Sequence, residues 1–413
     1  SNNTQLMASP KIAIVHDWLV NYSGAEKVLE QIINIYPDAS LYSLVDFLPD
    51  DLRWYVKNKK AGTSFIQKLP LARKHFRHYL PLMPFAIEQL DLSAYDIIIS
   101  SSFSVAKGVM TNANQLHICY CHSPMRYAWD LYQQYLKEEK LEKGLKGWLV
   151  RSVLHYIRNW DYASAGRVDY YIANSAYVAR RIKKSYRRDA AIIYPPVDTR
   201  KFVLSEEKKD FYLVASRMVP YKKLDIIAEA FTHMPAKKLI IVGDGPDFKK
   251  IKKKAGPNVQ FTGHVPHSLL IKYMQMARAF ILAADEDFGI TSVEAQACGT
   301  PVIAYKKGGL RETVIENRTG IYFDEQSWES IREAVERFEE GPELLSPSQI
   351  RKNALRFGIE VFKEKFEAYV RNCSYEANEE PRLSSLFSNH YNTGSNKTAN
   401  NKRSDTKSYH PFK

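Results

Sequence analysis

The sequence predicts an α/β protein made of two doubly wound domains that face each other across a cleft. Short apolar runs alternate with segments of helical periodicity, and this alternation occurs twice along the chain. A chain of 413 residues is long enough for two such domains. Between the two series lies the run Pro195–Asp198, whose paired prolines favour a stiff extended linker over a continuing helix.

The first series places a strand at residues 11–16, with a turn and a helix after it. Strands are expected at residues 11–16, 96–101, 117–121, 169–174 and 192–194, and helices at 27–35 and 176–185. Ser175 precedes the second helix, and its hydroxyl can accept a hydrogen bond from a free N–H group of the first turn. Residues 1–10 are polar and lack a pattern, so we expect no regular structure there.

The second series repeats the pattern after the linker. Strands are expected at residues 211–216, 238–243, 259–263, 279–284, 302–304 and 320–323, and helices at 224–231, 290–298, from 309 and at 351–370. The expected domains are therefore residues 11–198, residues 199–350 and a last helical segment at 351–373. Residues 374–413 are rich in Asn, Ser and Lys, and this composition predicts a disordered tail.

The chain carries a net charge of +13 and has a pI near 9.3, which favours a polyanionic partner. Nucleic acid, an anionic membrane surface and a phosphate-bearing substrate all satisfy that condition. No apolar run reaches the roughly 18–20 residues that span a bilayer. The four cysteines are widely placed and lack the second pair that a zinc site needs, which is typical of reduced thiols in a cytoplasmic protein.

Two stretches combine basic and aromatic side chains, at residues 51–90 and 143–158. Such a face suits contact with the surface of a membrane. The same pattern also arises when the charged side chains face solvent and the aromatic side chains pack into the core. The sequence leaves both interpretations open.

Residues 279–313 carry the main chemical signal. Glu286 lies in the loop at the carboxyl end of a predicted strand, where open α/β sheets bind ligands, and Glu294 lies eight residues later on a predicted helix. Between them, Gly289, Thr291 and Ser292 leave the start of the helix uncrowded, and a helix N-terminus attracts phosphate. The segment therefore predicts an anion site flanked by acidic acceptors for hydroxyl groups, as a nucleotide sugar requires. The spacing of Glu286 and Glu294 by itself is typical of two solvated acids on the surface, and this is the alternative interpretation.

The run EDFGITSVEAQACGTPVIA, which starts at Glu286, resembles the signature of the retaining glycosyltransferases of family 4. The resemblance extends over about residues 11–370. It implies the GT-B fold, in which the last helix crosses back onto the first domain. It also implies that Glu286 orients the hydroxyls of the donor sugar and that Glu294 holds the ribose of the nucleotide.

Other segments match the same family. The pair Arg217 and Lys222 follows a predicted strand and resembles the family's Arg-x-x-x-x-Lys phosphate clamp, which implies catalytic roles for both beside Glu286. The segment CYCHSPMRYAWD resembles the corresponding stretch of bacterial mannosyltransferases, where the histidine lies against the donor sugar, so His122 is the fourth expected catalytic residue. Arg126 and Trp129 are weaker candidates on the acceptor side.

The remaining expected donor-binding residues lie in loops at the ends of predicted strands. Ser23 and Gly24 resemble the family's Gly-Gly-x-Glu turn, with serine in place of the first glycine. The donor-binding set is Ser23, Gly24, Gly243, Asp244, Gly263, His264, Asp287, Phe288, Gly289, Ile290, Thr291 and Glu294. No Asp-x-Asp site stands in a matching position, so we expect no metal and no cofactor beyond the donor.

The resemblance implies transfer of a sugar, with mannose from GDP-mannose favoured, to a glycan or polyprenyl-diphosphate-linked acceptor in cell-surface polysaccharide biosynthesis. The expected location is the cytoplasm, with a peripheral site on the inner face of the plasma membrane left open. The alternatives are a UDP-sugar donor, a phosphorylase or sugar-phosphate synthase of the same fold, and a basic nucleic-acid-binding protein. No known nucleic-acid motif appears, and the cations are spread over both halves, so we expect no nucleic-acid partner.

Overall fold

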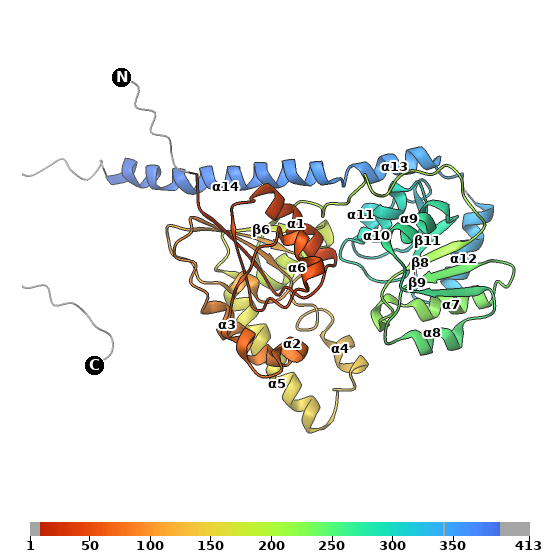
Figure 1. Ribbon diagram of the computed structural model, residues 1–413, viewed down its shortest axis with the longest axis horizontal. Helices are drawn as coiled ribbons and strands as arrows, with labels where there is room; N and C mark the ends of the chain where they lie inside the picture. The colour runs from red at the N-terminus through yellow and green to blue at the C-terminus, as the bar shows by residue number, and fades with distance from the viewer. Residues whose placement is uncertain (1–8, 342, 389–413) are drawn as a thin grey trace, which may run out of the picture. The chain divides into compact units, whose positions relative to one another are not determined.

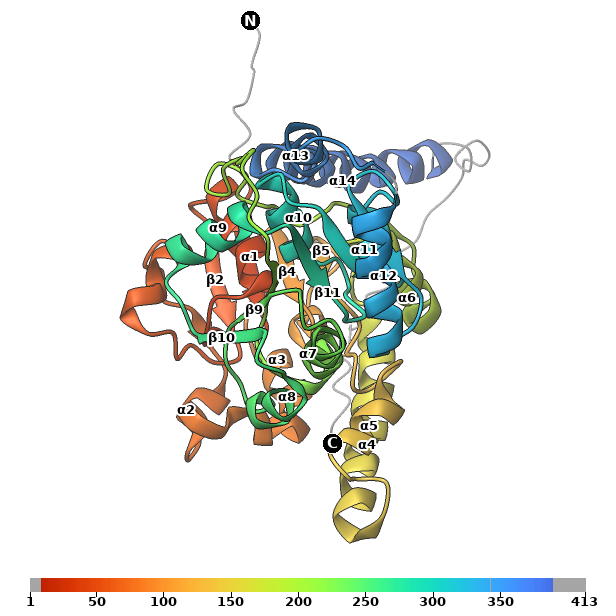
Figure 2. The same ribbon diagram turned by 90° about the vertical axis from the view of Figure 1, so that its right-hand side faces the viewer.

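The computed structural model describes residues 9–341 and 343–388 of the chain. Residues up to Val370 form one compact unit, which contains two parallel β-sheets. We call the part with the first sheet, up to residue 197, the first lobe, and residues 198–358 the second lobe. Figures 1 and 2 show the two sheets and the helices that belong to each.

The first lobe is built on a seven-stranded sheet with the order β3-β2-β1-β4-β5-β6-β7. Its strands are β1 (Ile12–His16), β2 (Ser40–Ser43), β3 (Gly62–Thr63), β4 (Ile97–Ser102), β5 (Leu116–Cys121), β6 (Tyr170–Ala173) and β7 (Ala190–Ile192). Its helices are α1 (Gly24–Ile35), η1 (Asp50–Val56), η2 (Phe65–Lys68), α2 (Ala72–His75), η3 (Phe76–Leu82), α3 (Met83–Glu88), η4 (Ala106–Gly108), α4 (Tyr132–Glu138), α5 (Gly144–Ala165) and α6 (Ala176–Tyr186). Strands β4 and β5 are buried along their whole length, and apart from His117 their side chains are apolar, aromatic or small.

The second lobe is built on a six-stranded sheet with the order β10-β9-β8-β11-β12-β13. Its strands are β8 (Tyr212–Ala215), β9 (Leu239–Val242), β10 (Val259–Gly263), β11 (Ala279–Leu282), β12 (Val302–Tyr305) and β13 (Gly320–Phe323). Its helices are η5 (Pro220–Lys222), α7 (Leu224–Thr232), α8 (Phe248–Lys254), α9 (His267–Met276), α10 (Ile290–Ala297), α11 (Leu310–Thr313), α12 (Trp328–Glu340) and α13 (Pro347–Leu355). In both lobes the registered strand pairs are parallel, as in a doubly wound fold.

The core of the second lobe has two layers because alternate residues of each strand point to opposite faces. Leu213, Ile240 and Phe280 pack with side chains of α9, α10 and α13 on one face. Their neighbours Tyr212 and Ile241 pack with side chains of α7, α8 and α12 on the other face. The predicted class, two Rossmann-like parallel sheets, is confirmed.

The single helix expected at 351–370 is interrupted at residues 356–358, and the helix after the break, α14 (Ile359–Ser388), returns to the first lobe as expected. The ring of Phe362 lies 6.1 Å from that of Tyr120 on β5, and the ring of Phe366 lies 6.4 Å from that of Tyr36. The helix does not end near residue 374, so residues 374–388 of the predicted disordered tail are helical. Composition alone misses this extension, because a helix that has already formed adds residues at little cost. The rest of that tail, like residues 1–8, lies outside the described residues.

Two segments cross between the lobes, and they lie side by side. The N–H of Val197 donates to the carbonyl of Phe357 at 2.9 Å, and Val197 also forms a bridge with Gly358. The strand expected at 192–194 ends earlier, since β7 pairs with β6 only through Ala190–Ile192. Tyr194 turns away instead and stacks on Phe288 of the second lobe at 5.6 Å.

Candidate active site

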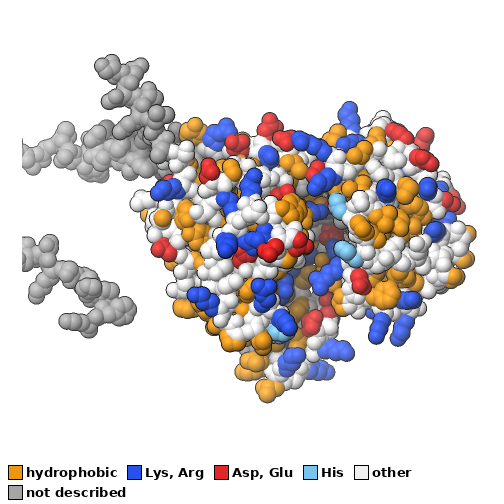
Figure 3. Space-filling view, viewed as in Figure 1, with side chains coloured by type: hydrophobic (Ala, Val, Ile, Leu, Met, Phe, Trp, Pro, Cys, Tyr) orange, Lys and Arg blue, Asp and Glu red, His pale blue; other side chains and the backbone are white. Residues whose placement is uncertain are grey.

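A cleft of about 580 Å³ opens between the two lobes (Figure 3). From the first lobe it is lined by the first turns of α1 and by residues of the loops that follow β1, β4, β5 and β6, and from the second lobe by residues 221–222, 286–291 and 294. These loops leave the carboxyl ends of parallel strands, which is where open α/β sheets bind ligands. The residues that line it and were predicted are Ser23, Gly24, His122, Arg126, Lys222, Glu286, Asp287, Phe288, Gly289, Ile290, Thr291 and Glu294.

Lys222 and Glu286 form an ion pair on the second-lobe wall of the cleft. Lys222 ends the short helix η5, and Glu286 lies in the loop after β11. Their side chains are 20% and 15% exposed. Burial lowers the pKa of Lys222, but the charges of Glu286 and Tyr221 outweigh it, and the net pKa is raised. The lysine is therefore a fixed positive charge at neutral pH.

The loop that carries Glu286 rests on the Gly308-Gly309 turn. The N–H of Gly309 donates to the carbonyl of Glu286 at 2.8 Å. A Cβ atom on Gly308 would lie 2.3 Å from the Glu286 carbonyl oxygen, and one on Gly309 would lie 2.2 Å from the Asp287 carbonyl oxygen. Only glycine allows this close approach of two backbones, so the turn fixes the height of Glu286 in the cleft.

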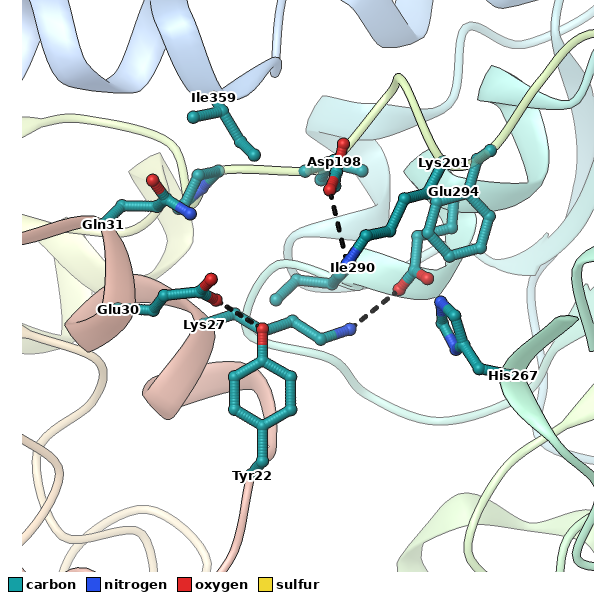
Figure 4. A pocket seen from close by; sticks show the side chains of 13 residues that line it. Tyr22, Lys27, Glu30, Gln31, Asp198, Lys201, His267, Ile290, Glu294 and Ile359 are labelled. Atoms are coloured by element: carbon teal, nitrogen blue, oxygen red, sulfur yellow. Dashed lines mark hydrogen bonds and ion pairs between the residues drawn. The ribbon is translucent and has the colours of Figure 1, made fainter. Parts of the chain in front are cut away.

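Helix α10 begins at the floor of the cleft. Gly289 precedes it with a φ of +83°, a conformation that favours glycine. Gly289, Ile290 and Thr291 line the cleft, so the positive end of the helix dipole faces it. One helical turn further, the buried Glu294 pairs with Lys27 of α1 at 3.4 Å across the lobes (Figure 4). This pair borders a smaller pocket that also contacts the crossing residues Pro196–Asp198.

His122 faces these groups from the first lobe. Its Nε2 lies 2.8 Å from Ser101 Oγ, which lies 3.0 Å from His16 Nδ1, and His16 in turn is 3.6 Å from Glu26. Burial, with a smaller contribution from His16, lowers the pKa of His122 to about 3. A neutral imidazole held in this buried chain can form a hydrogen bond with a ligand but carries no charge at neutral pH.

Six predicted site residues do not line the cleft: Arg217, Gly243, Asp244, Gly263, His264 and Trp129. Arg217 is exposed, and it lies near enough to Arg77 of the first lobe to add to the effect of burial in lowering the pKa of Arg77. The N–H of Gly243 donates to the Gly263 carbonyl at 2.9 Å, so these glycines join the ends of β9 and β10. Trp129 donates to Asp161 at 2.8 Å and packs, partly buried, against the core of the first lobe.

Several cleft residues were not expected from the sequence. Lys27, Phe103, Tyr127 and Tyr221 line the cleft beside the predicted residues. None carries a spacing signal, because each comes from a different loop or helix. Arg126 was expected and does more than line the cleft, since its Nη2 atom donates to the carbonyl of Asp285 in the opposite lobe at 3.1 Å.

Within residues 9–341 and 343–388, no group of three His, Cys, Asp or Glu side chains is arranged to hold a metal ion. The same part of the chain contains no helix that is both long and apolar enough to cross a bilayer.

Two family models match successive parts of the chain. The model of glycosyltransferase family 4 matches residues 45–201, in the first lobe, and the model of glycosyl transferases group 1 matches residues 198–357, the second lobe. The chain carries both of these glycosyltransferase domains. This assignment confirms the resemblance seen in residues 286–304.

Curated relatives of this glycosyltransferase share about a quarter to a third of the residues in the matched region. An uncharacterised glycosyltransferase of Methanocaldococcus jannaschii is 27% identical over 203 residues, covering 48% of this chain and 55% of the relative. The GDP-mannose-dependent alpha-(1-6)-phosphatidylinositol monomannoside mannosyltransferase of Mycobacterium tuberculosis is 31% identical over 192 residues, covering 39% and 50%. The chain therefore spans about half the length of the curated relatives it matches.

Solved structures share the fold over most of the chain. Sucrose-phosphate synthase of Thermosynechococcus elongatus has a TM-score of 0.66 at 16% identity and covers 89% of this glycosyltransferase and all of its own chain. The Anabaena protein HepE, solved with UDP and glucose, has a TM-score of 0.63 at 19% identity and covers 88% and 99%. These likenesses establish the GT-B fold.

Proposed function

We propose that this glycosyltransferase transfers a hexose from a nucleotide sugar to a hydroxyl group of a glycan or lipid-linked acceptor. The observation that supports the proposal most strongly is the arrangement in the cleft. A partly buried lysine, the N-terminus of α10 and two carboxylates converge on one wall, and a neutral histidine faces them from the other lobe. This set matches the diphosphate and the hydroxyl groups of a nucleotide sugar.

In the proposed reaction, the bond between the anomeric carbon and the diphosphate oxygen breaks. Negative charge grows on the departing diphosphate, and the ammonium group of Lys222 and the N–H groups at the start of α10 stabilise that charge. The acceptor hydroxyl attacks the anomeric carbon on the face that the diphosphate leaves, and its proton passes to the diphosphate. This course retains the anomeric configuration and needs no metal ion.

Glu286 and His122 are proposed to orient the donor sugar from opposite sides. The carboxylate of Glu286 accepts hydrogen bonds from sugar hydroxyls while it remains paired with Lys222. The imidazole of His122 completes the site from the first lobe, which would make reaction depend on both lobes being close. Glu294 is proposed to hold the ribose hydroxyls, so donor binding would compete with or rearrange the Lys27 pair.

The donor we favour is GDP-mannose. Two mycobacterial relatives whose names specify GDP-mannose are 29% and 31% identical to this chain over 192 residues. A UDP-sugar donor remains the alternative, and the transferase family makes nucleic-acid binding the weaker hypothesis.

A panel of nucleotide sugars tests the proposal. GDP-mannose, UDP-glucose and ADP-glucose are each incubated with the protein, and the release of nucleoside diphosphate and the shift in melting temperature are measured. We expect the largest shift and slow hydrolysis with GDP-mannose. Absence of binding and turnover with every member of the panel would contradict the proposed activity.

We also propose that the first lobe binds an anionic membrane surface through the amino-terminal half of α5. Leu145, Trp148 and Leu149 lie on one face of this helix at helical spacing, and they are 82%, 60% and 58% exposed. Lys143 and Lys146 stand beside them, and residues 140–158 contain five Lys or Arg and one Glu. Apolar side chains ringed by cations suit the interface of an anionic bilayer. In Figure 1, α5 extends away from the sheet of its lobe.

Vesicle flotation tests the membrane proposal. The protein is expected to float with phosphatidylserine vesicles and not with phosphatidylcholine vesicles, and the double substitution Trp148→Glu and Leu149→Glu should abolish flotation. Ile315→Glu is the matched control, because Ile315 is an exposed apolar side chain of the second lobe. Equal flotation of the double variant and the control would contradict the proposal.

A further inference from the structure

The carboxylate of Glu312 lies at the N-terminus of a helix in the opposite lobe. Glu312 is on α11 of the second lobe and is half-buried. Its Oε1 accepts a hydrogen bond from the N–H of Ala176 at 2.7 Å, and its Oε2 accepts one from the N–H of Tyr177 at 3.1 Å. Oε1 also accepts a bond from the hydroxyl of Tyr194, beside the crossing segment, at 3.1 Å.

These bonds complete the capping of α6. The first N–H groups of a helix have no partner within the helix, and a negative charge is favoured there. Ser175 satisfies the N–H of Val178 with its own hydroxyl, which also donates to the Asp287 carbonyl at 2.7 Å. Two of the first three N–H groups of this first-lobe helix are therefore capped by an acid of the second lobe.

The same helix holds the residues on both sides of Glu286. Arg181 of α6 pairs with Asp287 at 2.5 Å and with Asp130 at 2.7 Å. The hydroxyl of Tyr177 donates to Asp285 Oδ2 at 3.1 Å. Burial raises the pKa of Asp287, and the charges of Arg126 and Arg181 oppose that effect. Glu286, between these two anchored residues, points instead to Lys222.

We propose that Glu312 is a positioning residue for the transfer reaction. By capping α6 across the cleft, it docks the loop at 285–287 on the first lobe and so sets Glu286 and Lys222 opposite His122. The inference rests on the proposed transferase activity. The donor-binding groups belong mainly to the second lobe, whereas His122 and the acceptor side belong to the first lobe. Loss of the contact should therefore reduce kcat and leave donor binding nearly unchanged.

The substitution Glu312→Gln tests this division. It removes the charge and one acceptor while keeping the shape of the side chain. We expect kcat to fall about tenfold, equivalent to ~1.4 kcal/mol, while the Kd for the donor changes by less than about threefold. Glu316→Gln is the matched control, because Glu316 is an exposed acid near α11 that pairs with Lys306 at 3.1 Å. An unchanged kcat in Glu312→Gln would overturn the inference.

A rescue experiment separates positioning from simple stabilisation of α6. Adding Ala176→Asp to the Glu312→Gln variant gives the helix a negative charge from its own lobe and restores its capping. Recovery of kcat would show that Glu312 acts only through helix stability, which would overturn the inference. Should Glu312→Gln fail to fold, Tyr194→Phe removes one hydrogen bond to the same carboxylate. It should lower kcat about threefold at constant donor Kd, and an unchanged kcat would again overturn the inference.

The two failures are distinguishable. If the unsubstituted protein neither binds nor turns over any nucleotide sugar, the proposed function fails. If it turns over its donor and the Glu312→Gln variant does so equally fast, only the positioning role fails.

Discussion

Replacement of Lys222 by Met is the substitution that the cleft makes most informative. Methionine keeps the length and the apolar stem of lysine and removes the ammonium group. The lysine side chain is 20% exposed and its ammonium group pairs with Glu286, so solvent screens the charge only in part. Removing one buried donor that stabilises developing negative charge costs ~10²–10³ in kcat, or about 2.7–4 kcal/mol. We expect a fall of that size in kcat with GDP-mannose.

The assay measures kcat from the release of nucleoside diphosphate, and calorimetry measures the Kd for the donor. Lys223→Gln is the matched control. Lys223 is adjacent in sequence and does not line the cleft, and its substitution leaves the charge of Lys222 in place. The Lys222→Met variant leaves the carboxylate of Glu286 without its cation, so some loss of stability accompanies the loss of rate. Adding Glu286→Gln should recover stability without recovering rate. A folded Lys222→Met variant whose kcat lies within about threefold of the unsubstituted enzyme would refute the electrostatic reasoning.

Three further predictions concern donor binding and stability. Glu294→Gln should raise the KM for the donor about tenfold with a smaller change in kcat, because a ribose acceptor is weakened; steady-state kinetics check this, and an unchanged KM contradicts it. Burial lowers the pKa of both His117 and His122 to about 3 in the folded state, below the ~6.5 of the unfolded chain. The unfolded chain then binds more protons as the pH falls below 6.5, so the free energy of unfolding should fall between pH 6.5 and 3, by up to ~1.4 kcal/mol per pH unit for each histidine. Urea midpoints at pH 7, 6 and 5 check this, and a constant midpoint would contradict it. Asp161→Asn should destabilise the first lobe by ~3–5 kcal/mol, because it removes the negative charge that pairs with the fully buried Lys107 at 2.7 Å, and urea unfolding measures the loss.

The strands were predictable where burial made them continuous apolar runs. Residues 97–99 and 239–242 are such runs, and both lie in interior strands, with a neighbour on each side. The short strand β2, Ser40–Ser43, has a mixed sequence and half its residues only partly buried, so the same signal was absent. Helix α5 also escaped prediction, because its first turns expose their apolar side chains instead of burying them.

The candidate site was predictable where its residues are close in sequence. Residues 286–294 carry both carboxylates and the helix start within nine positions, and the structure brings them together on one wall. The partners across the cleft could not be derived in this way. Glu312 and Ala176 are 136 positions apart, and neither stands in a spacing pattern that suggests the other. Contacts between residues so far apart in the sequence can be recognised only once the arrangement of both sheets is known.

The adjacent crossings at Val197 and Gly358 determine how the lobes can move. The two covalent connections between the lobes lie side by side, so we expect the cleft to open by a hinge rotation about Val197 and Gly358. Displacement grows with distance from the axis, so groups beside residues 196–198, among them Glu294 and Lys27, separate least. With Glu294 holding the ribose as proposed, the nucleoside end of a donor would stay enclosed while the sugar end gains room for an acceptor to enter and a product to leave.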